Sequence, residues 1–162
     1  MEVFPDEGYV KLNGNKVDLN PSTEEIANDV SLFLKYMDGY RKFHGDVDGL
    51  QHRYYEFANW FFSSPFMGYM RDTATRNNHN ILPYPVFGLL YGQSKAGKTS
   101  FLKTLLKMMI GQTTALPAQD FTRSNIEGLK RQVKGAPIIV DDLTNTRFNQ
   151  HAIETIKSDE FG

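Results

Sequence analysis

The feature that most constrains this chain is a glycine-rich stretch, GQSKAGKTS, at residues 92–100. It matches the pattern G-x-x-x-x-G-K-[ST] in full. Gly92 and Gly97 allow the backbone to turn so that successive N–H groups point inward and form a nest for anions. We therefore expect nine residues to bind the phosphates of a nucleotide: Gly92, Gln93, Ser94, Lys95, Ala96, Gly97, Lys98, Thr99 and Ser100.

The last fixed positions of this P-loop supply a charge and a hydroxyl. Lys98 carries a mobile positive charge for the β- and γ-phosphates, so we assign it a catalytic role, and the Thr99 hydroxyl is a ligand for Mg²⁺. Lys95 lies inside the loop. The alternative to phosphate binding is that its side chain is only solvated.

The segments on either side of the loop fit this interpretation. The apolar run at residues 86–91 predicts a strand that is buried on both faces of a parallel sheet. The spacing of apolar residues after the loop predicts a helix from Thr99 to Ile110, with Gly111 as its C-cap. The N-terminus of that helix would add its positive end to the phosphate site.

The second motif is acidic: residues 137–142 read PIIVDD, and Asp141 lies 42 residues beyond Thr99. Three apolar residues ending in two acids are typical of a Walker B strand, although apolar strands ending in Asp are common in general. Ligands gather at the carboxyl ends of parallel strands, so we expect Asp141 to hold the metal ion. Asp142 would orient or deprotonate the attacking water, which makes it the second catalytic residue.

Between the two motifs there is room for one strand and one helix. Residues 113–118 predict a weak strand, and the sequence SNIE at residues 124–127 predicts a capping box with Ser124 at the start of a helix. The order from residue 86 is then strand, helix, strand, helix, strand. This order predicts an α/β class, with a partial P-loop parallel sheet and flanking helices in residues 81–162.

The first eighty residues predict a β-hairpin and a small helical bundle. Asn13-Gly14 is the dipeptide that best forms a tight hairpin turn, here within residues 9–19, and Ser22 with Glu25 predicts a capping box for the next helix. Further helices are expected at residues 50–62 and 66–73. The expected buried face of the first helix consists of Ile26, Val30, Phe33, Leu34 and Met37.

The intervening strand, together with an acid adjacent to Asp141, resembles the additional-strand class of P-loop ATPases, which includes AAA+, RecA-like and superfamily 3 helicase groups. The resemblance covers about residues 85–162. It implies Mg²⁺-dependent ATP hydrolysis and, most often, motor or remodelling activity on a macromolecule. Many AAA+ members have Glu where this sequence has Asp142.

Such a domain normally has five core strands, so the resemblance also implies that the 162 residues are a fragment truncated after Walker B. The sensor residue and the arginine finger would then lie outside the chain. We expect weak ATPase activity from the fragment, and self-association through its unpaired sheet edge.

Composition limits the cellular locations and partners to be expected. The chain has no cysteine, a net charge of −1 and no apolar run long enough for a transmembrane helix, and its N-terminus lacks the features of a secretory signal. A cytoplasmic protein without membrane partners is the expectation. The second half is mildly basic, which is compatible with a nucleotide or nucleic acid but well below the charge of a dedicated nucleic-acid binder.

Three functions remain in competition. The leading one is ATP hydrolysis in a larger motor that acts on DNA or RNA, with ATP and Mg²⁺ as cofactors. The alternative is a regulatory switch of the signalling or defence type, in which binding rather than turnover changes the contacts of the N-terminal bundle. A small-molecule kinase ranks lower, because such enzymes need an arginine-rich lid and the arginines beyond the P-loop are Arg123, Arg131 and Arg147.

Overall fold

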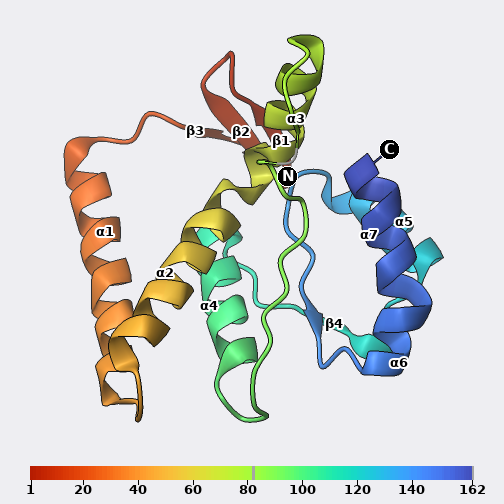
Figure 1. The fold of residues 1–162 in the computed structure, drawn as a ribbon. Helices are drawn as coiled ribbons and strands as arrows, with labels where there is room; N and C mark the ends of the chain where they lie inside the picture. The colour runs from red at the N-terminus through yellow and green to blue at the C-terminus, as the bar shows by residue number, and fades with distance from the viewer. Residues whose placement is uncertain (82, 162) are drawn as a thin grey trace.

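A computed structural model describes residues 1–81 and 83–161 of the chain, with side chains described as far as Lys157. Two small sheets and a set of helices make up the fold (Figure 1). The first part contains β1 (Glu2–Phe4), β2 (Tyr9–Leu12), β3 (Asn15–Asp18), α1 (Thr23–Asp38), the 3₁₀ helix η1 (Gly39–Lys42), α2 (Val47–Ser63), η2 (Ser64–Phe66) and α3 (Met67–Arg76). The second part contains α4 (Lys98–Ile110), β4 (Leu116–Pro117), η3 (Ala118–Asp120), α5 (Arg123–Val133), β5 (Val140–Asp141), α6 (Asn145–Arg147), the π-helical turn η4 (Phe148–Ala152) and α7 (Ile153–Phe161).

The N-terminal sheet confirms the predicted hairpin and adds one strand to it. Strands β2 and β3 are antiparallel, and the turn between them has positive φ at Asn13 (51°) and Gly14 (83°). Such angles belong to the turn that matches the twist of a two-stranded ribbon. Strand β1, which the sequence analysis did not predict, pairs with the other side of β2.

The start of the chain is fixed to the end of α5. The Met1 ammonium donates a hydrogen bond to the Val133 carbonyl oxygen at 2.7 Å, and the Gly135 N–H donates to the Met1 carbonyl oxygen at 3.0 Å. Glu2 and Lys134 form an ion pair beside these bonds. A positive group at the C-terminus of a helix is favourable because the last carbonyls of the helix carry negative partial charge.

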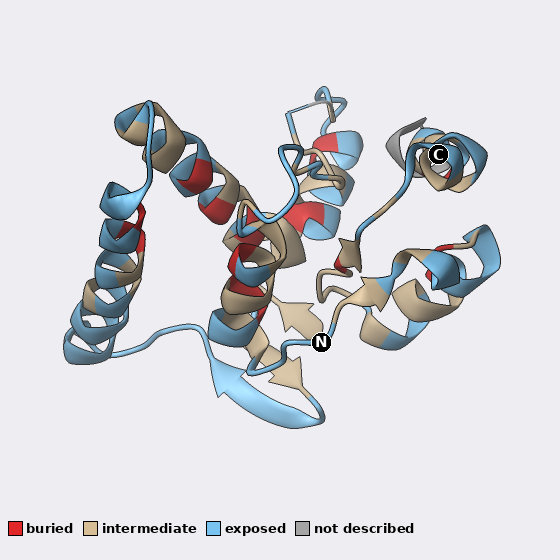
Figure 2. Cartoon of the chain, turned by 90° about the horizontal axis from the view of Figure 1, so that it is seen from below, coloured by how far each residue is buried: buried red, intermediate tan, exposed pale blue. Residues whose placement is uncertain are grey.

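Helix α1 begins with the predicted capping box, in which Ser22 and Glu25 bond to each other's backbone N–H groups. The prediction of its buried face is wrong over much of its length: Met37 is buried and Phe33 half-buried, but Ile26, Val30 and Leu34 are about half exposed. Figure 1 shows the reason, since α1 and α2 meet near η1 and separate toward the start of α1. Figure 2 accordingly shows exposed and half-buried residues over most of α1.

The larger core lies between α2 and α4. Phe101 and Leu105 of α4 and Ala58 of α2 have no exposed surface. Phe101 is surrounded by aromatic rings, and its centroid lies 4.5 Å from that of Tyr54 in an edge-to-face arrangement. We call this group the aromatic cluster; its members are Tyr36, Tyr40, Tyr54, Phe57 and Phe101.

This core includes side chains from both predicted parts of the chain. The aromatic residues of α2 contribute to this core unevenly, since Tyr54 and Phe61 are buried while Tyr55 is exposed. Phe101 packs with residues from the predicted N-terminal part. The division into residues 1–80 and 81–162 stays a prediction, although this core is shared between the two parts.

No described helix is long and apolar enough to span a membrane.

The strand predicted at residues 86–91 is not present. Within the described residues this segment pairs with no strand, and Leu89 and Tyr91 are 70% and 93% exposed rather than buried on both faces. The apolar pattern of a segment does not determine whether a second strand lies beside it. A segment without such a neighbour forms no β-ladder and is therefore not a strand. We call residues 85–91 the lead segment; in Figure 1 it runs along α4 before the chain turns into that helix.

The second sheet is smaller than predicted but has the predicted direction. Strands β4 and β5 are parallel, with Leu116 opposite Val140 and Pro117 opposite Asp141. A second core lies beside this sheet and takes its buried residues from Phe121, Ile126 and Ala152. The expected α/β class is therefore present in part, as a two-stranded parallel sheet with helices.

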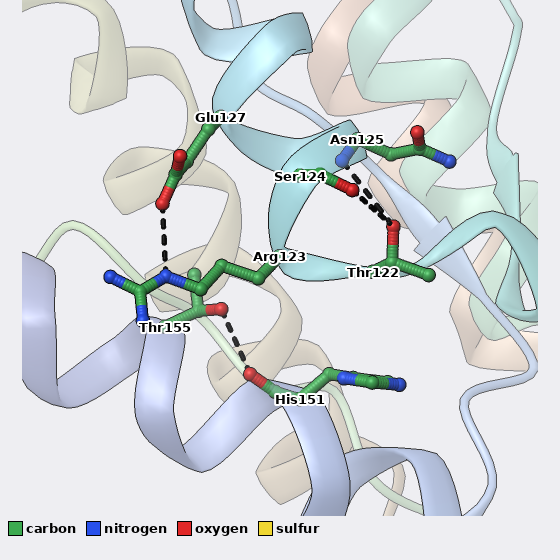
Figure 3. Close-up of polar contacts among 7 residues, drawn as sticks. All are labelled: Thr122, Arg123, Ser124, Asn125, Glu127, His151 and Thr155. Carbon is green, nitrogen blue, oxygen red and sulfur yellow. Dashed lines mark hydrogen bonds and ion pairs between the residues drawn. The ribbon is translucent and has the colours of Figure 1, made fainter.

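Helix α5 begins two residues earlier than the predicted capping box. Its N-cap is Thr122, whose hydroxyl accepts a hydrogen bond from the Asn125 N–H at 3.3 Å (Figure 3). Ser124 lies inside the first turn, so the prediction that it caps the helix is wrong. Its hydroxyl instead lies 3.3 Å from that of Thr122. The helix carries an Arg123–Glu127 pair on its first turns, and Thr155 of α7 donates to the His151 carbonyl oxygen nearby.

The burial of Phe101 leads to a stability prediction. Phe101→Ala removes a fully buried ring, and we expect the free energy of unfolding to fall by about 3–5 kcal/mol in urea denaturation. Met108→Ala is the matched control on the same helix, where the side chain is 43% exposed; a change within about 0.5 kcal/mol is expected there. Equal losses for the two variants would contradict this account of the core.

Candidate functional site

The glycine-rich loop turns through two residues with left-handed backbone before α4 begins. Lys95 has φ 63° and Gly97 has φ 81°, and Gly97 is the N-cap of α4. The helix starts at Lys98, one residue before the predicted start, and its C-cap Gly111 has the left-handed conformation expected there (φ 72°). Residues 92–95 and 97 are exposed, so the loop is open to a ligand in solution.

Lys98 is folded back over the start of the loop. Its Nζ atom donates hydrogen bonds to the carbonyl oxygens of Gly92 at 2.9 Å and Gln93 at 2.6 Å. In the part of the chain that the structure describes, Lys98 has no bond to either of the two motif aspartates. The ammonium group is thus held beside the loop by the loop's own carbonyls.

The two sequence motifs meet in one hydrogen bond. Thr99 Oγ1 lies 2.7 Å from Asp141 Oδ1, and the residues are 42 positions apart in the sequence. Asp141 ends strand β5, and the parallel partner β4 ends beside it at Pro117. The carboxyl end of the small sheet is therefore directed at the first turn of α4, as expected for ligand sites of parallel sheets.

Asp142 lies next to this contact in a different backbone conformation. Its φ is 51°, in the left-handed region that non-glycine residues rarely adopt, and its side chain is exposed. It lines a hollow of about 320 Å³ at the end of the sheet, together with Lys103, Ala115, Pro117, Ala118 and Asp141.

Lys103 is the charged residue of this hollow to which the sequence analysis assigned no role. It follows Thr99 by four positions in α4, a spacing that puts two side chains on the same face of a helix. That spacing was the available signal, but a helix face alone does not reveal what it faces. The hollow thus holds one ammonium and two carboxylates, and its other lining residues are uncharged.

The donor set at the Thr99–Asp141 contact fits Mg²⁺. This ion takes oxygen ligands and is usually held by one or two protein side chains, with water and substrate phosphates completing the shell. A hydroxyl and a carboxylate that already lie 2.7 Å apart match that requirement. Thr99 and Asp141 are therefore the residues that would hold the ion.

A protein-family model matches nearly the whole chain. The model of the Aq_aa27 P-loop NTPase domain matches residues 6–162. No curated protein and no solved structure matched the chain.

Gly97 leads to the prediction for this site. Gly97→Ala places a side chain at φ 81°, which we expect to lower the free energy of unfolding by about 1–2 kcal/mol. Gly128→Ala is the matched control, because Gly128 is helical in α5 and an added Cβ would meet nothing within 4 Å; it should raise the free energy of unfolding by about 0.4–1 kcal/mol. Thermal and urea denaturation measure both, and a stabilised Gly97→Ala protein would show that the loop adopts another backbone.

Proposed function

Since the chain belongs to the Aq_aa27 P-loop NTPase domain family, in which the P-loop binds a nucleotide, we propose that it binds Mg²⁺–ATP and Mg²⁺–ADP through residues 92–100 and hydrolyses ATP. The observation that carries the proposal is the hydrogen bond between Thr99 and Asp141. It brings a P-loop hydroxyl and the acid of a Walker B motif to one point at the end of a parallel sheet.

The residues of the site then have distinct tasks. The N–H groups of the loop and the N-terminus of α4 bind phosphate oxygens. Lys98 exchanges its bonds to the Gly92 and Gln93 carbonyls for bonds to the β- and γ-phosphates. Charge-assisted hydrogen bonds are about twice as strong as neutral ones, which favours this exchange.

The two acids have different tasks. When bound between Thr99 and Asp141, Mg²⁺ would neutralise charge on the phosphate oxygens. Asp142 is exposed beside Asp141 and orients the attacking water or accepts its proton. Lys103, in the same hollow, lowers the mutual repulsion of the two carboxylates.

The role of the reaction in the whole protein is a further proposal. As in the additional-strand ATPases that the sequence resembles, we propose that turnover in a longer protein drives movement along DNA or RNA. The parallel sheet of β4 and β5 has no third strand among the described residues, so its edges are open to a strand of a second copy. Self-association through such an edge is part of the proposal.

A nucleotide-dependent switch is the second candidate, and the aromatic cluster favours it. Phe101 follows Thr99 by two residues and is completely buried against rings from α1, η1 and α2. A shift of the first turn of α4 on nucleotide binding would therefore reach the N-terminal helices. Measured ATP turnover, with and without DNA or RNA, separates the two candidates, since a switch requires binding but little turnover.

The lysine of the loop gives the direct test of nucleotide binding. We expect Lys98→Ala to weaken Mg²⁺–ADP affinity about tenfold or more in calorimetry, because the charge that meets the phosphates is lost. Lys107→Ala removes the same charge from an exposed position nine residues further along α4 and should leave the affinity unchanged. Equal affinity of a folded Lys98→Ala protein would overturn the proposal.

The two acids are expected to differ in their effects. Asp141→Asn should weaken metal-dependent nucleotide binding, since a neutral amide is a poorer Mg²⁺ ligand, whereas Asp142→Asn should keep binding and lower turnover. Calorimetry with Mg²⁺ and with EDTA measures the first effect, and phosphate release from an active parent protein measures the second. The assignment is reversed if Asp142→Asn abolishes binding and Asp141→Asn changes neither quantity.

A further inference from the structure

The lead segment is placed by side chains rather than by a β-ladder. No backbone–backbone hydrogen bond joins residues 85–91 to another strand within the described parts of the chain. Leu90 packs against the larger core, and the Lys130 ammonium of α5 lies 5.7 Å from the ring centroid of Phe87. Burial there lowers the pKa of Lys130. These contacts fix the chain that leads directly into Gly92.

Trp60 of α2 also contacts the lead segment. Its indole N–H donates a hydrogen bond to the Pro85 carbonyl oxygen at 2.9 Å. Its ring also lies against Gly88, where an added Cβ would come within 2.4 Å of Cζ3 and 2.6 Å of Cη2. A side chain at position 88 would therefore displace the indole, and the sequence analysis assigned a role to neither residue.

The same helix contacts the chain on the other side of the glycine-rich loop. Tyr54 lies one and a half turns before Trp60 in α2, and its ring packs on Phe101 with centroids 4.5 Å apart. Pro85 and Gly88 precede the loop, and Phe101 follows it. Helix α2 therefore holds both flanks of residues 92–97, which are otherwise mostly exposed.

We propose that Trp60 is a positioning residue of the nucleotide site, which places the glycine-rich loop through its contacts with Pro85 and Gly88 and responds when a nucleotide binds. This inference rests on the proposed function, because it names a residue that regulates the same site. The loop must point several N–H groups at one set of phosphate oxygens, and small displacements of its leading residues weaken all of those bonds together.

The chain is suited to testing this, because Trp60 is its one tryptophan. The first measurement uses the chain without nucleotide. The indole N–H resonance and the emission maximum should both shift in Gly88→Ala, since the new methyl group displaces the ring. Gly68→Ala in α3 is the control, because its added Cβ would meet nothing within 4 Å. An unshifted indole signal in Gly88→Ala would overturn the proposal.

The second measurement is Mg²⁺–ADP affinity by calorimetry. Trp60→Phe keeps an aromatic ring but loses the donor to Pro85, and we expect its dissociation constant to rise roughly three- to tenfold. Tyr55→Phe removes a hydroxyl group from an exposed ring of the same helix and should leave affinity unchanged. The urea denaturation midpoints of the two variants are measured as well, so that a loss of nucleotide affinity is distinguished from a loss of stability.

The third measurement is Trp60 emission during ADP titration. In the unaltered chain we expect a saturable change with the midpoint found by calorimetry, and Lys98→Ala should require correspondingly more ADP. If the unaltered chain binds no nucleotide, the proposed function fails. If it binds nucleotide while emission stays constant, or if Trp60→Phe binds with unchanged affinity, the proposed function stands and the role of Trp60 is overturned.

Discussion

The burial of Phe101 is the interaction on which the arrangement of the molecule depends. This residue belongs to the first turn of α4, immediately after the glycine-rich loop, and its ring is enclosed by the aromatic cluster. Full burial of a phenylalanine side chain contributes about 1.5–3 kcal/mol, a large part of the stability of a small domain. The start of α4 is therefore the best-anchored point near the loop, and the Thr99–Asp141 bond extends that anchoring to the second sheet.

The features that the sequence predicts correctly are those with a local cause. Asn13-Gly14 forms its turn because both residues tolerate positive φ, and Ser22 with Glu25 forms its box within four consecutive residues. Gly111 ends α4 for the same kind of reason. The fixed spacing within the P-loop motif likewise places Lys98 and Thr99 at the start of a helix, so most of the candidate site was visible before the structure.

The features that the sequence misjudges depend on partners far away in the chain. The apolar run at residues 86–91 has the composition of a buried strand, but a strand needs a neighbour to pair with. Ile26 and Val30 lie on the expected face of α1, yet the separation of α1 from α2 leaves them exposed. The cap of α5 is a local exception: Thr122, two residues before the predicted Ser124, is the N-cap, and both carry a hydroxyl that can accept the bond.

The lead segment is held by side-chain contacts rather than by a β-ladder, and this affects how readily it moves when a ligand binds. A strand in the middle of a parallel sheet is fixed by many cooperative backbone bonds, whereas the lead segment is held by a few contacts from α2, α5 and the core. A hydrogen bond of this kind contributes a net stabilisation of about 1 kcal/mol. A ligand shifts an equilibrium by its difference in affinity for the two states, so a modest difference suffices to move a segment held this weakly. Because α2 contacts both the lead segment and Phe101, such a movement would be transmitted to the N-terminal helices rather than absorbed within the loop.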